Sequence, residues 1–563
     1  MSPGLDKGIE NSWSLGLFAS GASELEPAGA AERILGFVSD DGLVFRRGGS
    51  RYQSNTALGA SGLLWVWDGW LGAVRRTVFA SPTSSSVLTA DDATPLTVVA
   101  IAAGVIRPVV VAGSLMLPTS PTTWSFYGGS LKAASYSTGT VTVTQDSTTV
   151  TGVGTSWLAN VDAGMTLKIV GFNAIRTVSK VNSNASLELT VPWTASTTAG
   201  TTYLLSPVAS TGYAPSLSSV TAAIQNRFVA RDANDNAVLW FSAIINPQTI
   251  AASDFYRFQG QIIGLGVLRD VLLVFTTAGV YAVSNMAYDL VDASGNPQQR
   301  SELVNADLIA WGHEGIAPYS GALVVPALDN VWLMDNLSAP TPIADRILDL
   351  YLSYVRTSGY KPGVAEVYNG HYFLPILNGT TWVDTLVCRL KATHDGNNFA
   401  WTQLLGQGAE VSAFAERSGT NPPLLLGASR KTTSRVLDLS GYLNPTAATK
   451  NDADGTTPTF QLTTRNIPTG NQVVNSLHFI VLAYTLTDAA SDNPVFTAEV
   501  NPDDAGWTTL TGNAPEAGPA NAYTWPCSVA ARHVRFRFTC TLPSSALKIE
   551  SLAYFMRKSG LYT

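Results

Sequence analysis

Residues 267–283 read VLRDVLLVFTTAGVYAV, and this stretch decides the fold class. One apolar run ends at Arg269-Asp270, a second extends from Val271 to Phe275, and a third follows Gly279. Short apolar runs that are rich in Val and bounded by Asp and Gly are typical of β-strands joined by tight turns. The stretch therefore predicts a strand, a turn and a returning strand, followed closely by another strand.

The same unit recurs along the chain, each time with a turn at Asp, Asn or Gly and an aromatic residue on the returning strand. Further examples are LLWVWDGWLGAV at 63–74, NRFVARDANDNAVLWF at 226–241, ALVVPALDNVWLM at 322–334 and VAEVYNGHYFL at 364–374. One hairpin cannot bury its two faces alone. Units repeated every ~40–50 residues form propeller blades, which close radially. We predict an all-β chain whose body is a β-propeller of about six to eight blades.

Length and composition agree with a large body that carries added modules. The chain has 563 residues, of which 45% are hydrophobic and 13% are charged. These values supply apolar material for a core and oppose charge-driven disorder. The net charge is −7, and the pairs Arg46-Arg47 and Arg75-Arg76 stand alone. A surface that grips nucleic acid needs clustered Lys and Arg, so this class is disfavoured.

Two segments differ in residue pattern from the repeated unit. Residues 136–206 contain Thr/Val strands and predict a small β-domain inserted into the propeller. Residues 446–563 predict a β-sandwich of jelly-roll type, because the alternation from Val534 to Phe538 places aromatic rings on one face and arginines on the other. The expected organisation is an N-terminal arm with first strands at 1–50, propeller at 51–135 and 207–445, and these two added domains. The clearest helical pattern covers Ala344–Val355.

No targeting or membrane segment is predicted. Met1–Glu10 lacks the basic flank and the apolar core of a signal peptide. The apolar stretch 96–117 contains Arg107-Pro108 and predicts two buried strands rather than a spanning helix. Cys527 and Cys540 are candidates for a disulfide in an oxidising compartment, but the pattern favours buried small residues, as for Cys388.

The motifs that carry chemistry are incomplete. His313-Glu314 is followed by Ala317 where a zincin helix needs its second His, and Gly264-Leu265-Gly266 lacks the third Gly of a dinucleotide loop. Asp232–Asn236 lacks the Gly and Glu of a calcium loop and predicts a hairpin turn, and Asp452–Gly455 predicts a linker. The five histidines are scattered, and the candidate glycosidase carboxylates Asp254, Asp270 and Glu302 have no fixed spacing. We predict no catalytic, cofactor-binding or metal site, and no enzyme.

Three stretches resemble the tail nozzle proteins of short-tailed bacteriophages, also described as tail hub or tail tubular protein B-like proteins. They are Ser39–Gly49, then Asn226–Ser242 with Ser253–Tyr256, then Gly264–Thr276 with Gly279–Tyr281. The likeness covers about half of the chain. It rests on fold-building patterns rather than on chemical groups.

The resemblance implies a structural virion protein that is assembled in the host cytoplasm. Its copies would form a ring, usually a hexamer, below the portal and adaptor proteins. Double-stranded DNA would pass through the lumen during ejection without specific binding, and fibres, spikes or a tip would attach outside. Residues 1–30 would lie against a neighbouring subunit. The alternatives are a receptor-binding or fibre-tip protein, a propeller glycosidase and a cell-surface binding module.

Overall fold

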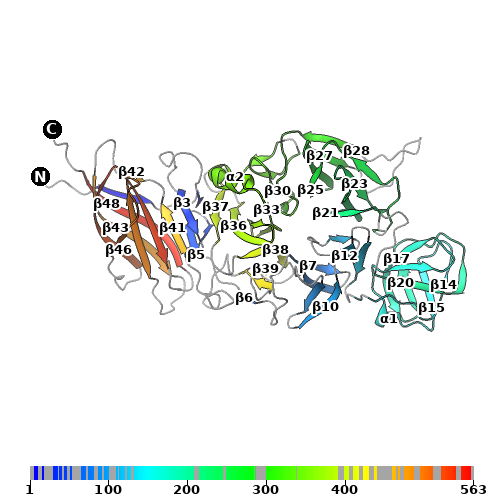
Figure 1. Ribbon diagram of the computed structural model, residues 1–563. Helices are drawn as coiled ribbons and strands as arrows, with labels where there is room; N and C mark the ends of the chain where they lie inside the picture. Colours follow the sequence, from blue (N-terminus) through cyan, green and yellow to red (C-terminus); the bar gives the residue numbers. More distant parts are fainter. Residues whose placement is uncertain are drawn as a thin grey trace.

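The computed structural model is built of three β-rich bodies in a row (Figure 1). Up to residue 133 it describes the strands β1–β13 and a few residues beside them. Beyond that point it describes 134–207, 215–286, 300–390, 399–440 and 460–558, with short gaps. The middle body is a β-propeller, the body at one end is an inserted β-domain, and a β-sandwich at the other end holds both chain termini. This is the fold class that the sequence predicts.

Seven sheets surround the propeller axis in the described part of the chain. Blade 1 contains β7 (Trp65–Leu71), β8 (Val74–Ala80), β9 (Ser86–Asp91) and β10 (Thr94–Ala100). Blade 2 contains β11 (Val109–Val111), β12 (Ser114–Ser120) and β13 (Thr123–Tyr127). Blade 3 contains β21 (Leu217–Ile224), β22 (Arg227–Asp232), β23 (Val238–Phe241) and β24 (Phe255–Arg257). Blade 4 contains β25 (Ile262–Leu268), β26 (Val271–Thr276), β27 (Gly279–Ser284) and β28 (Arg300–Asn305).

The remaining blades follow in chain order. Blade 5 contains β29 (Ala317–Tyr319), β30 (Ala322–Pro326), β31 (Val331–Met334) and β32 (Thr341–Pro342). Blade 6 contains β33 (Tyr360–Pro362), β34 (Glu366–Tyr368), β35 (His371–Asn378), β36 (Thr381–Arg389) and β37 (Ala400–Gln403), where β33 and β34 both pair with β35. Blade 7 contains β38 (Val411–Arg417), β39 (Leu424–Ser429) and β40 (Val436–Asp438). Every strand pair within these blades is antiparallel.

The ring is closed by the N-terminal part of the chain. The short strand β6 (Arg51–Tyr52) pairs with β40 and becomes the fourth strand of blade 7. The first strand of blade 7, β38, lies against the first strand of blade 1, β7. A blade shared between an early and a late segment holds the circle shut, because opening it requires breaking main-chain hydrogen bonds.

Packing between neighbouring blades explains the continuous apolar run at 267–283. Successive side chains of a strand point to opposite faces of the sheet. Leu272 and Val274 of β26 therefore pack toward blade 3, whereas Leu273 and Phe275 pack toward blade 5. All four are fully buried. A strand between two other sheets has no solvent face, so its sequence does not alternate between apolar and polar residues.

A helix lies between blades 5 and 6, where the sequence predicts it. It begins as a 3-10 turn at Asp345–Ile347 and continues as α2 (Leu348–Arg356). Tyr351 is fully buried in the core shared by these blades, and its hydroxyl donates a hydrogen bond to the carbonyl oxygen of Ala327 at 2.6 Å. No helix in the described residues is long and apolar enough to cross a membrane. The apolar stretch 96–117 contains parts of β10, β11 and β12.

The inserted domain has its own core and leaves the propeller beside blade 2. Its strands are β14 (Thr140–Val143), β15 (Thr149–Val153), β16 (Thr166–Ile169), β17 (Ile175–Ser183), β18 (Ser186–Leu189), β19 (Thr198–Thr201) and β20 (Tyr203–Ser206), with the short helix α1 (Trp157–Asn160). β19 and β20 are consecutive in the chain but stand at opposite ends of the strand order, so the sheet curls on itself. The Phe126 amide donates to the Pro207 carbonyl at 2.6 Å, which brings the returning chain back to β13.

The sandwich contains strands from both ends of the chain. One sheet has the order β4 (Phe37–Asp40), β5 (Leu43–Arg46), β48 (Leu547–Lys558), β43 (Asn475–Leu486) and β46 (Asn521–Ala531), with β1 (Asp6–Glu10) on β48. The other has β3 (Ala30–Leu35), β41 (Phe460–Thr464), β47 (His533–Cys540), β44 (Phe496–Pro502) and β45 (Thr508–Leu510), with β42 (Ile467–Pro468) on β47. Val534, Phe536 and Phe538 point into the core between the sheets, as the alternation predicts.

The first fifty residues differ from the arm that the sequence suggests. The predicted strand, Asp-Gly turn and strand is present as β4 and β5. However, β1 and β5 pair with β48, and β3 pairs with β41. β2 (Gly16–Leu17) and β3 also lie parallel to β37, so one sheet continues from blade 6 into the sandwich. Strand pairing between opposite ends of a chain leaves no local signature, which is why these strands read as an extended arm.

Candidate functional site

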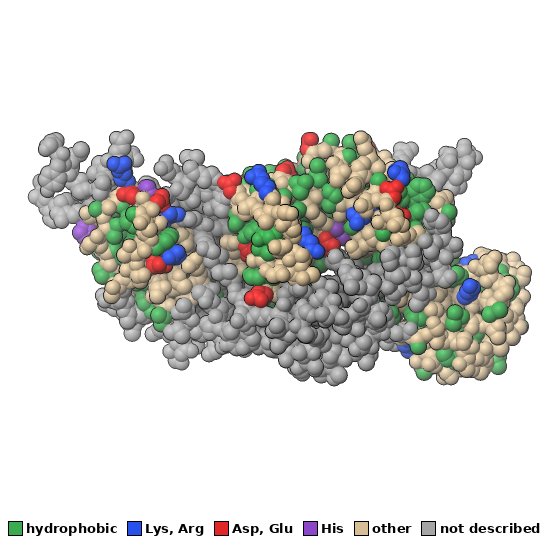
Figure 2. Space-filling view, viewed as in Figure 1, with side chains coloured by type: hydrophobic (Ala, Val, Ile, Leu, Met, Phe, Trp, Pro, Cys, Tyr) green, Lys and Arg blue, Asp and Glu red, His purple; other side chains and the backbone are tan. Residues whose placement is uncertain are grey.

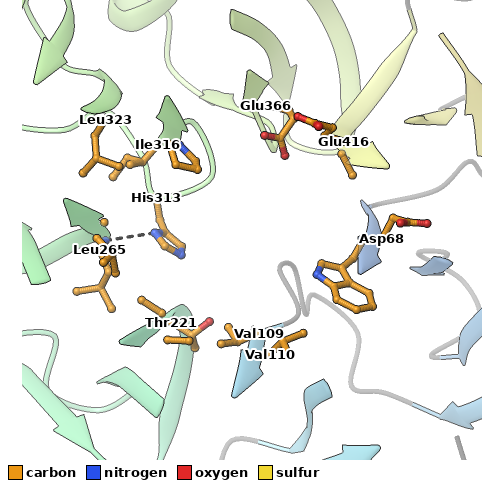
Figure 3. A pocket seen from close by; sticks show the side chains of 17 residues that line it. Asp68, Val109, Val110, Thr221, Leu265, His313, Ile316, Leu323, Glu366 and Glu416 are labelled. Carbon is orange, nitrogen blue, oxygen red and sulfur yellow. Dashed lines mark hydrogen bonds between the residues drawn. The ribbon is translucent and has the colours of Figure 1, made fainter. Parts of the chain in front are cut away.

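The inner strands of the seven blades line a half-open cavity of about 340 Å³. Each blade contributes at least one residue to the wall of this cavity. In order from blade 1 to blade 7, these residues include Asp68, Val110, Thr221, Leu265, Pro318, Glu366 and Glu416. Figure 3 shows several of these side chains around the open space. In strand order the contributing residues come from β7, β11, β21, β25, β29, β34 and β38. Because every blade takes part, the cavity marks the axis of the propeller.

Two glycines of blade 4, Gly264 and Gly266, allow the chain around His313 and Ile316 to approach β25 closely at this cavity. A Cβ on Gly264 would lie 2.8 Å from Ile316 Cδ1 and 3.3 Å from His313 Cα, and a Cβ on Gly266 would lie 2.8 Å from Leu323 Cδ1. Neither contact leaves room for a larger residue without movement. The Gly264-Leu265-Gly266 motif therefore serves close packing between blades 4 and 5, and it places His313 at the cavity wall.

His313 is anchored by the main chain. The Leu265 amide donates a hydrogen bond to His313 Nδ1 at 3.2 Å, and the imidazole is almost completely buried. In a neutral ring whose Nδ1 accepts, the proton is on Nε2. Figure 3 shows the ring lying over the cavity. His313-Glu314 lies in the loop before β29.

Three acidic residues, Asp68, Glu366 and Glu416, line the cavity, but in Figure 3 the Asp68 carboxylate points away from the open space. Asp68 accepts a hydrogen bond from the Thr77 hydroxyl at 2.5 Å and lies 3.7 Å from Arg417 Nε. Glu366 Oε1 accepts a hydrogen bond from the Val367 amide at 3.1 Å. Glu416 reaches the cavity from β38, which lies beside β34. In Figure 3 the Glu366 and Glu416 carboxylates are at the same side of the open space.

The carboxylates considered from the sequence lie elsewhere and are not brought together. Asp254 accepts a hydrogen bond from the Ala251 amide in the turn before β24, Asp270 is exposed in the β25–β26 turn, and Glu302 is exposed on the outer strand of blade 4. Asp68, Glu366 and Glu416 were not singled out from the sequence, because what distinguishes them is their place on the inner strand of a blade. That place becomes visible only when the blade borders are known.

The hairpin predicted at Asp232–Asn236 is present. Asp232 Oδ1 accepts the amides of Asn234 and Asp235 at 2.7 and 2.9 Å, and Asp232 Oδ2 accepts the Trp240 indole N–H at 2.7 Å. The Asp side chain thus closes the turn between β22 and β23. Asp452–Gly455 and His394 are outside the described residues. Within the described residues, no group of three or more His, Cys, Asp or Glu side chains is placed to hold a metal ion.

The three cysteines are buried free thiols, as the favoured interpretation predicts. Burial raises the pKa of Cys527 to about 12 and that of Cys388 well above its usual value. A thiol whose pKa is raised in this way remains protonated at neutral pH, and the thiolate is the reactive form. Cys388 packs in the core between blades 5 and 6, and Cys527 and Cys540 pack in the sandwich core.

No family model and no curated protein matches the chain. Solved structures that it resembles include Sqt1 of Saccharomyces cerevisiae, at 9% identity over 69% of this chain and 99% of that chain, with a TM-score of 0.35. The PQQ-bound aldose sugar dehydrogenase of Streptomyces coelicolor gives 10% identity over 70% and 98%, with a TM-score of 0.27. The exo-beta-1,3-galactanase of Phanerochaete chrysosporium gives 11% over 74% and 96%, with a TM-score of 0.19. These likenesses carry no argument about activity.

Proposed function

We propose that this chain is a structural subunit of a bacteriophage tail, of the nozzle or hub type. In the proposed assembly several copies, six by the resemblance, form a ring below the portal and adaptor proteins. Genomic DNA leaves through the lumen of that ring, and fibres or a tip attach to its outside. The cavity within one propeller, at about 340 Å³, is a pocket on the scale of a small molecule, so the DNA path belongs to the ring.

The observation that carries the proposal is the arrangement of the three bodies. The inserted domain and the sandwich lie at opposite ends of the propeller, and the sandwich is joined to blade 6 by main-chain pairing through β2 and β3 (Figure 1). A molecule of this kind presents separate surfaces at fixed positions. That arrangement suits a scaffold that contacts different neighbours at each end.

The surface charge supports a ring lumen that does not bind DNA. The chain has a net charge of −7, and Figure 2 shows Lys and Arg interspersed with Asp and Glu over the described part of one face. Binding to a phosphate backbone is driven largely by the release of counterions from clustered basic side chains. Large apolar side chains are also exposed, including Trp70 at 56% and Val170 at 62%. Such side chains are suitable contacts for neighbouring subunits.

The proposal is tested by fractionating phage particles that carry the chain. We expect mass spectrometry to detect the chain in DNase-treated particles and in isolated tails after the capsids are removed, at several copies per particle. The purified chain should leave capsular polysaccharide intact. Absence of the chain from purified particles, or release of sugar fragments by the purified chain, would reject a structural tail role.

A further inference from the structure

One face of the β-sandwich turns an ordered row of polar side chains outward. Alternate residues of β47 point into the core, so His533, Arg535 and Arg537 lie half-buried on the outer face. On the neighbouring strand β44, Glu499 stands directly opposite Arg537. Arg537 Nε and Nη2 donate hydrogen bonds to the two carboxylate oxygens of Glu499 at 2.6 and 2.7 Å. These two side chains therefore form a flat, fixed polar pair on this face.

The indole of Trp507 lies over this polar face. The Trp507 ring centroid is 4.3 Å from the guanidinium carbon of Arg537 and 5.7 Å from that of Arg535. Both arginines project from the same side of β47, so the ring rests on the outer face rather than in the core. Trp507 precedes the edge strand β45 and remains partly exposed. A flat aromatic surface is therefore presented to solvent at the edge of the sheet.

Each arginine beneath the ring has a carboxylate partner. Arg537 is held by Glu499, and Arg535 donates a hydrogen bond to Asp504. The hydrogen bonds from Arg537 lower the pKa of Glu499, which keeps this carboxylate ionised at neutral pH. An anionic ligand would meet these carboxylates as well as the guanidinium groups. The charge pattern therefore favours a neutral ligand over a phosphate or an acidic peptide.

The loop that carries Trp507 is held in a strained conformation. Asp503 and Asp504 have φ values of +45° and +58°, a region that costs energy for residues other than glycine. Asp503 Oδ1 accepts hydrogen bonds from the amides of Arg532 and His533 at 2.9 and 3.0 Å, which ties the loop to the start of β47. Strain of this kind persists where contacts fix it, and it is common at ligand-binding loops. The ring is thus positioned before a ligand arrives, which lowers the entropy cost of binding.

The chemistry around the ring identifies a class of ligand. Thr497 and Thr509 are exposed and share the face of Glu499, since Thr497 is two residues away on β44 and Thr509 is directly opposite on β45. They add hydroxyl groups beside the aromatic surface. A pyranose sugar with equatorial hydroxyl groups has the matching shape, with a flat face of C–H groups and a rim of hydroxyls. The C–H face packs on an aromatic ring, and the rim bonds to polar side chains.

We propose that this outer face of the sandwich, around Trp507, binds a neutral oligosaccharide of β-linked glucose type. One sugar ring stacks on the Trp507 indole, and its hydroxyl groups bond to the polar side chains beside it, among them Thr497 and Thr509. Such a site binds sugar without cleaving it and does not depend on the tail role.

The first test uses isothermal titration calorimetry of the unaltered chain with two probes. Cellohexaose is a neutral β-1,4-linked glucan, and a heparin hexasaccharide of similar length is strongly anionic. We expect cellohexaose to bind at one site per chain and with the same affinity at low and high salt, because salt screens only interactions between charges. No binding of cellohexaose, or binding of the heparin fragment alone, overturns the proposal.

The second test places the sugar on the ring. Trp507→Ala should weaken cellohexaose binding about tenfold, because the stacked aromatic surface is lost. Trp507→Tyr keeps a flat ring and should retain most of the affinity. The control is Trp70→Ala, which removes a Trp that is 56% exposed on the propeller and should leave binding unchanged. Thermal melting shows that each variant is folded. Equal affinity of Trp507→Ala and the unaltered chain, or an equal loss in Trp507→Ala and Trp70→Ala, contradicts the assignment.

Discussion

At the scale of single residues, stability depends on large side chains that are fully enclosed. Trp157 of α1 has no exposed surface, and its indole N–H donates to the Tyr203 hydroxyl at 3.0 Å. The Tyr203 hydroxyl donates in turn to the Thr138 carbonyl at 2.7 Å, and burial raises the pKa of Tyr203 to about 12. A Cβ on Gly152 would lie 2.7 Å from Trp157 Cη2, so a glycine there makes room for the ring.

Trp157→Ala should lower the stability of the inserted domain by about 3–5 kcal/mol, because it leaves a cavity and removes the hydrogen bond to Tyr203. The matched control is Leu158→Ala on the same helix, where the side chain is 55% exposed and the change should stay below about 0.5 kcal/mol. Hydrogen exchange of the full chain, followed by mass spectrometry, measures the opening free energy of residues 140–206. Equal exchange in the two variants would show that Trp157 is not the anchor of this core.

The sequence said least about which individual residues line the cavity. The repeated pattern predicts hairpins, but it does not say which strand of a hairpin faces the axis. Asp68, Glu366 and Glu416 all line the cavity because β7, β34 and β38 lie on the inner side of their blades. His313 could be noticed from the sequence, yet its position depends on the close approach allowed by Gly264 and Gly266.

At the scale of elements, the N-terminal strands hold the sandwich to the propeller. β1 pairs with β48, β3 pairs with both β37 and β41, and β6 completes blade 7. Local hairpins such as β22–β23 and β30–β31 could be predicted, because Asp, Asn and Gly mark their turns. Pairings between opposite ends of the chain could not, because nothing in a short strand specifies a partner so distant in sequence.

Deletion of residues 1–30 removes β1 and β2 and the first residue of β3. We expect the sandwich to lose stability and to melt at a lower temperature than the rest of the chain, because the edge of β48 and the join to β37 lose hydrogen bonds. Scanning calorimetry should show this shift, and limited proteolysis should cut first between 440 and 558. Deletion of residues 1–5, which precede β1, is the control. A melting profile identical to that of the intact chain would contradict the role given to these strands.

At the scale of the whole molecule, we propose that the three bodies form a scaffold subunit of a phage tail. The fold class followed from the sequence because strand and turn patterns are local and are repeated in each blade. The assembly could not be predicted from the sequence, because a ring depends on surfaces of different subunits that meet only in the particle. The sandwich and the inserted domain, at opposite ends of the propeller, are the surfaces that we assign to different neighbours (Figure 1).

The most direct measurement is a cryo-EM reconstruction of the particle that carries this chain, with no symmetry imposed on the tail. We expect a ring of about six copies around the axial channel, below the portal, with the inserted domain and the sandwich in contact with different tail components. Density for the chain at a fibre tip, or on the tail periphery away from the channel, would contradict the nozzle assignment and favour a receptor-binding role.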